Sequence, residues 1–130
     1  MKKKILVVED DEDIRSALAF RLVKQGFIVS TAVDGEEGLK EINDEIPDLV
    51  ILDLGLPKLP GEEVCKAIKD GYDKMLRKIP IIMLTAKATD VDQVMGHVIG
   101  ADRYLTKPFD GENLLKEIRS CLCLDNAVDS

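Results

Sequence analysis

The apolar positions of this chain form short uninterrupted runs separated by longer stretches of mixed composition. Residues 5–8, 49–52 and 81–84 are apolar throughout, which is typical of strands buried on both faces of a parallel sheet. Two further segments, 27–32 and 103–105, contain the β-branched or aromatic residues that favour strands. The pattern therefore predicts five strands.

Each expected strand is followed by a segment in which apolar residues recur at the spacing of one helix face. Gly26 ends the first of these helices, Asp34 caps the second before Pro47 ends it, and Gly71 can break the third before Met75. Five strands that alternate with five helices predict an α/β fold, an open, doubly wound parallel sheet with helices on both faces. The apolar positions that mark the helices are Ile14, Ala17, Leu18 and Leu22; Leu39, Ile42 and Ile46; Val64, Ala67 and Ile68; Val91, Val94, Met95 and Val98; and Leu114, Leu115, Ile118 and Leu122.

Polar side chains follow four of the five expected strands directly. In open α/β sheets, ligands bind beyond the carboxyl ends of the strands, where such side chains meet. We therefore expect a group of acids, a hydroxyl and an ammonium group to lie at one edge of the sheet. The residues are Glu9, Asp10 and Asp11 after the first strand, Asp53 after the third, Thr85 after the fourth and Lys107 after the fifth.

This cluster suits one kind of chemistry. Carboxylates that lie close together repel one another unless a cation neutralises them, and oxygen-only ligands suit Mg²⁺. An aspartate can act as a nucleophile and form an aspartyl phosphate, whose added charge a metal, a lysine and a hydroxyl would stabilise. Taken alone, the acidic run 9–13 has a simpler interpretation, because a helix dipole stabilises acids at its N-terminus. Asp53 is harder to explain this way, since four apolar residues precede it and a turn follows.

Composition narrows the possible classes of function. The 130 residues fit one domain, and 45% hydrophobic residues suffice for one core. A net charge of −7 disfavours a nucleic-acid-binding surface, although a local basic patch is compatible with it. No apolar run approaches the ~20 residues of a membrane span, and the sequence contains no glycine-rich phosphate loop. Three cysteines without a C-x-x-C spacing are typical of reduced thiols in a cytoplasmic protein.

Four segments carry a resemblance to a known family. They are residues 5–11 (ILVVEDD), 49–57 (LVILDLGLP), 80–86 (PIIMLTA) and 100–109 (GADRYLTKPF). In this order and at these separations they resemble the receiver domains of response regulators in two-component signalling. The resemblance implies a flavodoxin-like sheet with the strand order 2-1-3-4-5. It also implies that residues 1–124 form the receiver domain and that 125–130 are a polar tail.

The resemblance implies a role for each matching residue at the acidic end of the sheet. Glu9 and Asp10 would hold the metal, Mg²⁺, although the run of acids leaves a one-residue ambiguity with Asp11. Asp53 would be the phosphorylated residue and a further metal ligand. Gly55 would offer its backbone carbonyl to the metal, a contact that needs no side chain.

Three further residues match the switch positions of the family. Thr85 resembles the hydroxyl that turns toward the phosphoryl oxygens, and Lys107 resembles the lysine that pairs with the phosphoryl group. Tyr104 resembles the aromatic side chain that moves inward on activation. The resemblance also implies a cis peptide bond between Lys107 and Pro108.

The chain departs from the family at three places. Gly55 is often a larger residue, Pro60 replaces a residue that is commonly acidic or small and polar, and the segment 70–78 is a little long. In the family, side chains two positions after the phosphorylated aspartate and after the switch threonine flank the water that attacks the acyl phosphate. Here these positions hold Gly55 and Lys87, and we expect Lys87 either to slow dephosphorylation or to stay in solvent.

The expected function is that of a phosphoacceptor. A phosphohistidine on a sensor histidine kinase or a histidine phosphotransfer protein would give its phosphoryl group to Asp53. Shifts of Thr85 and Tyr104 would then change the affinity for a downstream output domain or protein. We expect no direct contact with nucleic acid or membrane, and no enzyme activity beyond the domain's own phosphotransfer and dephosphorylation.

Two other classes of function compete with this expectation. An interaction module could bind a partner without phosphorylation, but such a module has no need of the acids, Thr85 and Lys107 together. A metal-dependent phosphatase on the same kind of sheet would carry a second acid two residues after its nucleophile, where this chain has Gly55. The sequence leaves open whether the chain is a stand-alone receiver or part of a larger regulator.

Overall fold

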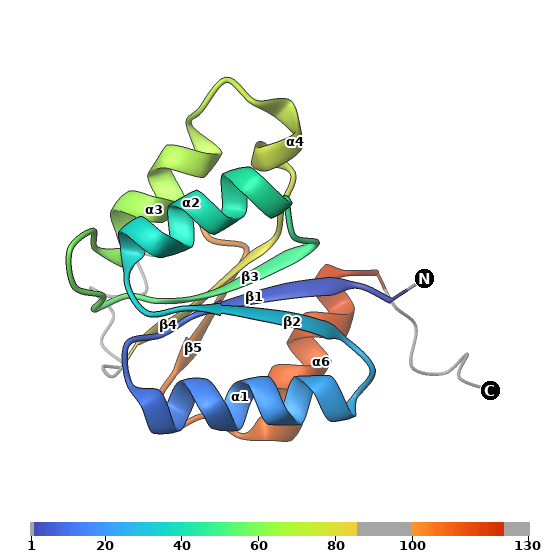
Figure 1. Ribbon diagram of the computed structural model, residues 1–130. Coiled ribbons are helices and arrows are strands. Elements are labelled where there is room, and N and C mark those ends of the chain that lie inside the picture. Colours follow the sequence, from blue (N-terminus) through green and yellow to red (C-terminus); the bar gives the residue numbers. More distant parts are fainter. Residues whose placement is uncertain (1, 86–99, 124–130) are drawn as a thin grey trace.

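The structure of the chain is a computed structural model that describes residues 2–85 and 100–123. Within these residues, strands and helices alternate from the N-terminus as far as α3, and a second short helix then precedes β4 (Figure 1). The helix expected around residues 91–98, Lys87 and the tail 125–130 lie outside the described residues. The elements are β1 (Lys4–Val8), α1 (Glu12–Lys24), β2 (Ile28–Ala32), α2 (Gly35–Glu45), β3 (Leu49–Asp53), α3 (Gly61–Lys69), α4 (Lys74–Arg77), β4 (Ile81–Thr85), β5 (Arg103–Thr106) and α6 (Gly111–Cys121).

The five strands form one parallel sheet in the order β2-β1-β3-β4-β5, so the predicted fold class and strand order are confirmed. The register pairs Asp53 with Leu84 and Thr85 with Thr106. Because all strands run the same way, their carboxyl ends meet at one edge, and β1 and β3 lie beside each other at its centre. This order brings the residues after β1, β3, β4 and β5 to one place.

Alternate residues of the strands divide the core into two layers, because successive side chains of a strand point to opposite faces. Helices α2 and α3 cover one face of the sheet, and α1 and α6 cover the other (Figure 1). The buried strand residues of the first layer are Leu6, Val8, Ala32, Val50, Leu52, Ile81 and Met83. Those of the second layer are Ile5, Val7, Leu49, Ile51, Ile82 and Leu84.

The helices begin where an aspartate can bind their free N–H groups. Asp11, Asp34 and Asp110 each accept a hydrogen bond from a backbone N–H in the first turn of α1, α2 and α6, so the predicted cap at Asp34 is confirmed. Helix α3 differs, because Pro60 occupies the cap position and its side chain makes no such bond. Every helix among the described residues is too short or too polar to traverse a lipid bilayer.

Three predicted boundaries can be compared with the structure. Strand β2 begins one residue later than expected, because the Phe27 N–H donates to the Leu22 carbonyl at the end of α1. Helix α2 ends before Ile46, which has left-handed backbone angles (φ 44°) and precedes Pro47, a position where the helical conformation is disfavoured. The break expected at Gly71 is confirmed, since α3 ends at Lys69 and a separate four-residue helix, α4, follows.

Candidate functional site

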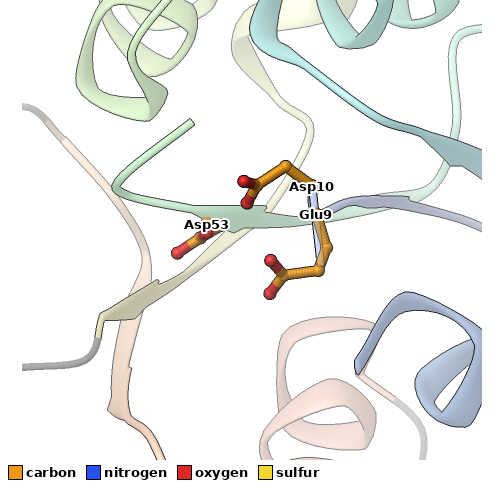
Figure 2. Close-up of side chains that lie close together, drawn as sticks. All are labelled: Glu9, Asp10 and Asp53. Carbon is orange, nitrogen blue, oxygen red and sulfur yellow. The ribbon is translucent and has the colours of Figure 1, made fainter. Parts of the chain in front are cut away.

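Three carboxylates gather at the carboxyl edge of the sheet. Glu9 and Asp10 directly follow β1, and Asp53 is the last residue of the neighbouring strand β3. One carboxylate oxygen from each lies within 4.8 Å of the other two (Figure 2). Glu9 is 1% exposed and Asp53 7% exposed, whereas Asp10 is open to solvent. The cluster is therefore buried on the protein side and reachable from solvent on the other.

A lysine from the far strand of the sheet completes this cluster. Lys107 follows β5, and its Nζ lies 2.7 Å from Oε1 of Glu9 and 3.4 Å from Oδ1 of Asp53. Its backbone N–H donates to the Thr85 carbonyl, and the peptide bond to Pro108 is cis, as the resemblance implies. Of the strand-end residues expected to meet, the structure brings Glu9, Asp10, Asp53 and Lys107 together.

Burial governs the protonation of the Glu9–Lys107 pair. It raises the pKa of Glu9 above its ordinary value, and the bonds from Lys107 and from the Asp11 N–H only partly oppose this rise. Burial also acts to lower the pKa of Lys107, but the neighbouring Glu9 and Asp53 outweigh it and leave that pKa raised. Burial therefore makes the ionised form of Glu9 costly, and a further cation beside it would lower that cost.

The structure separates the two candidate acids, Asp10 and Asp11. One carboxylate oxygen of Asp11 accepts the N–H of Ile14 at 3.0 Å and so caps α1. The Asp10 carboxylate instead joins Glu9 and Asp53. The geometry thus favours Asp10, the residue that the sequence also favoured, as the second acid of the cluster.

Three other predicted residues lie around the cluster. Thr85 ends β4 and is 4% exposed. Tyr104, in β5, is half-buried and packs against the first core layer. Gly55 lies exposed in the turn after β3, and apart from its chain neighbours no atom of the described residues lies within 4 Å of where a Cβ would stand. These positions agree with the expected places in the fold, and the roles assigned to the three residues stay predictions.

The sequence reasoning missed two residues beside the site. Arg15, in the first turns of α1, donates through Nη1 to the carbonyls of Glu9 (3.0 Å) and Asp10 (3.3 Å). Gly61 begins α3 so close to Asp53 that a Cβ there would clash with the Asp53 backbone oxygen. A signal for Arg15 existed, because it is the first cation after five consecutive acids.

This fold and this group of side chains coincide with a known family. The sequence profile of the response regulator receiver domain matches residues 5–119, and the chain belongs to this family of two-component signalling domains. A relative is the alkaline phosphatase synthesis transcriptional regulatory protein PhoP of Bacillus subtilis (strain 168), with 47% identity over 122 residues. The match covers 94% of this chain and 49% of PhoP, so the chain spans about half the length of that relative.

Solved structures of receiver domains resemble the chain closely. A response regulator receiver domain protein (CheY-like) from Methanospirillum hungatei JF-1 is 31% identical with a TM-score of 0.86, over 95% of both chains. The BeF3-activated N-terminal receiver domain of Klebsiella pneumoniae RstA is 30% identical with a TM-score of 0.83. That match covers 92% of this chain and 97% of the other.

Proposed function

We propose that the domain accepts a phosphoryl group on Asp53 from a phosphohistidine of a sensor histidine kinase or a histidine phosphotransfer protein. The observation that carries the proposal is the position of Asp53, which ends a buried strand beside two other carboxylates and 3.4 Å from the Lys107 ammonium group. Such an arrangement suits phosphoryl transfer onto a carboxylate better than it suits packing. Family membership supports the same chemistry.

The donor set at the cluster fits Mg²⁺. Glu9, Asp10 and Asp53 offer oxygen atoms only, close enough to share one ion, and hard cations prefer such ligands. The carbonyl of Gly55, which is exposed in the next turn, is the fourth protein ligand that we propose. When bound, Mg²⁺ supplies positive charge that stabilises the transferring phosphoryl group.

The chain's own residues carry the transfer itself. An Asp53 carboxylate oxygen attacks phosphorus in line, so that an O–P bond forms while the P–N bond to the donor imidazole breaks. The imidazole nitrogen leaves with the bond's electron pair. Lys107 Nζ, already beside both Glu9 and Asp53, binds the oxygens of the new acyl phosphate, and the Thr85 hydroxyl donates to another of them.

Output follows from the change at Thr85 and Tyr104. The proposed movement of Thr85 toward the phosphoryl group frees space for Tyr104, which shifts the population between two surface states. An output domain or protein reads the altered surface. Because PhoP is a transcriptional regulatory protein about twice as long as the match, we propose an output that acts in transcription, and a cytoplasmic location for the whole protein.

Mass spectrometry of the intact protein tests the proposal. After incubation with Mg²⁺ and acetyl phosphate, wild type should gain one phosphoryl group, and Asp53→Asn should gain none. Asp70→Asn, which removes an exposed acid elsewhere, is the matched control and should be phosphorylated like wild type. A phosphoryl group that persists in Asp53→Asn would overturn the assignment.

A further inference from the structure

Arg15 stands in an unusual environment for an arginine. It follows five consecutive acids, Glu9 to Asp13, yet no carboxylate oxygen of the described residues lies within 4.0 Å of its guanidinium group. Its bonds go instead to two successive main-chain carbonyls, those of Glu9 and Asp10. The side chain is half-buried, and the bond to the Glu9 carbonyl is partly shielded from water, whereas the bond to the Asp10 carbonyl is exposed. Arg15 thus fixes the path of the main chain and leaves the acid side chains to one another.

The carboxylates of Glu9 and Asp10 are held in different ways. Both oxygens of Glu9 are engaged, since Oε1 accepts from Lys107 Nζ and Oε2 accepts from the Asp11 N–H at 3.2 Å. Among the described residues, the Asp10 carboxylate has no hydrogen bond or ion pair. Its position therefore depends on where the main chain holds the Asp10 Cα. Among the described residues, the Arg15 bond at 3.3 Å is the side-chain contact made to the Asp10 carbonyl itself.

We propose that Arg15 is a positioning residue, which holds the loop between β1 and α1 so that Asp10 faces Glu9 and Asp53 before any metal binds. This inference rests on the proposed function insofar as the cluster receives Mg²⁺. Both bonds come from one nitrogen, Nη1, whose two N–H groups are fixed in the plane of the guanidinium group. The N–H groups of a lysine ammonium rotate freely, so a lysine would hold the two carbonyls less rigidly. Partners behind the direct ligands of a metal commonly control its affinity in this way.

The charge of Arg15 makes the inference sharply testable. A positive charge beside a cation site opposes metal binding by Coulomb repulsion, so removing it would tighten binding if charge were the whole effect. Loss of the positioning bonds would weaken binding. The two explanations therefore predict changes of opposite sign for the same substitution.

The first experiment measures Mg²⁺ affinity by isothermal titration calorimetry at constant ionic strength. Arg15→Met keeps the apolar stem and should weaken binding by about tenfold, the lower end of what loss of such a partner costs. Arg15→Lys, which keeps the charge but not the planar guanidinium group, should also bind more weakly than wild type. Lys24→Met removes the same charge from the last turn of α1 and should bind like wild type. Affinity in Arg15→Met equal to or tighter than that of wild type would overturn the inference.

A second experiment needs no metal, and so separates this inference from the proposed function. Amide hydrogen exchange by NMR in metal-free protein should show severalfold faster exchange at the Asp11 N–H in Arg15→Met than in wild type. Amides in the middle of β3 should exchange unchanged, and urea unfolding should show nearly the same global stability. Unchanged exchange at Asp11 would refute the positioning role even if wild type binds no Mg²⁺. Failure of wild type to bind Mg²⁺, with faster Asp11 exchange in the variant, would instead count only against the proposed function.

Discussion

The two edges of the central sheet each hold a half-buried lysine bound to an aspartate, but they differ in how completely their polar groups are matched. At the amino edge, Lys69 Nζ binds Asp102 Oδ2 (3.1 Å) and the carbonyls of Arg77 (3.2 Å) and Ile79 (2.7 Å). These contacts use all three N–H groups of the ammonium. The same Asp102 oxygen accepts the N–H of Ile81, the first residue of β4. One cation here meets one carboxylate and a set of backbone groups.

At the carboxyl edge, Lys107 has similar exposure, 19% of its side chain against 16% for Lys69, but it binds two carboxylates of a cluster of three. With all groups ionised, three negative charges and one positive charge leave an excess of two negative charges. One of the acids, Asp10, has no partner among the described residues. The comparison teaches that burial alone does not mark a functional site. The carboxyl edge differs from the amino edge because its carboxylates outnumber the cations beside them.

The largest effect on folding should come from removing Lys69 at the amino edge, where its ammonium group is fully paired. Lys69→Met removes the cation beside Asp102 and the donor to the carbonyls of Arg77 and Ile79, and we expect the free energy of unfolding to fall by about 2 kcal/mol. Urea denaturation followed by circular dichroism measures this. Lys66→Met, at an exposed position of the same helix, is the control and should change stability little. Equal losses in both variants would show that the network contributes nothing specific.

The next effect concerns the carboxyl edge, where we expect Mg²⁺ to raise the free energy of unfolding. At a Mg²⁺ concentration ten times its Kd, the free energy of unfolding of wild type should rise by about 1.4 kcal/mol. Asp10→Asn should gain clearly less at the same concentration, because it has lost a ligand, whereas Asp102→Asn should gain as much as wild type. Urea denaturation with and without Mg²⁺, at fixed ionic strength, gives these differences. An equal reduction of this gain in both variants would contradict Mg²⁺ binding at the carboxyl edge.

A third effect is smaller. Without metal, an Asp→Asn substitution should change the free energy of unfolding in opposite directions at the two edges. Asp102→Asn should lower the free energy of unfolding by about 1 kcal/mol, because it removes the charged acceptor of Lys69 and Ile81. Asp10→Asn should raise it by about 0.5 kcal/mol, because it relieves repulsion among exposed and buried acids. Thermal and urea unfolding in the presence of a chelator measure both. Changes of the same sign would show that the carboxyl edge is not under electrostatic strain.

The smallest expected effect is a pH dependence that arises from Glu9. Burial raises its pKa in the folded protein above the ordinary 4.5, so above that pH the folded state keeps a proton that the unfolded chain has lost. The free energy of unfolding therefore falls as the pH rises from 4.5 through the folded-state pKa. Wild type should lose stability in this window relative to Glu9→Gln, and Mg²⁺ should reverse the trend. Parallel pH profiles for the two proteins without metal would contradict the assignment.

The position of the site could be predicted from the sequence because apolar runs stop where strands end. Asp53 and Thr85 follow such runs directly, and the parallel sheet then puts them at one edge. The runs alone did not show that β1 and β3 are neighbours, because any order of five buried strands satisfies the same pattern. The resemblance to receiver domains supplied that order, and the structure confirms it.

The contacts of Arg15 and Lys69 could not be predicted in the same way. Both side chains bind backbone carbonyls, and a carbonyl is the same at every position of the chain. No pattern of residue types therefore identifies the partner. The separation of α3 from α4 adds to the difficulty, because the Lys69 network depends on the turn that brings Arg77 and Ile79 back to the end of α3. Such contacts emerge only once the chain path is known.

The two glycines that bracket the loop after β3 set opposite limits on engineering. Gly61 tolerates no side chain, since even a methyl group would meet the Asp53 backbone oxygen. At Gly55, two residues from Asp53, a Cβ would meet no atom of the described residues within 4 Å, apart from its chain neighbours. A cysteine introduced there, after replacement of the exposed Cys123, would hold a fluorescent label beside Asp53 without displacing the chain. Position 55 is thus the natural attachment point for an optical reporter of the state of this domain.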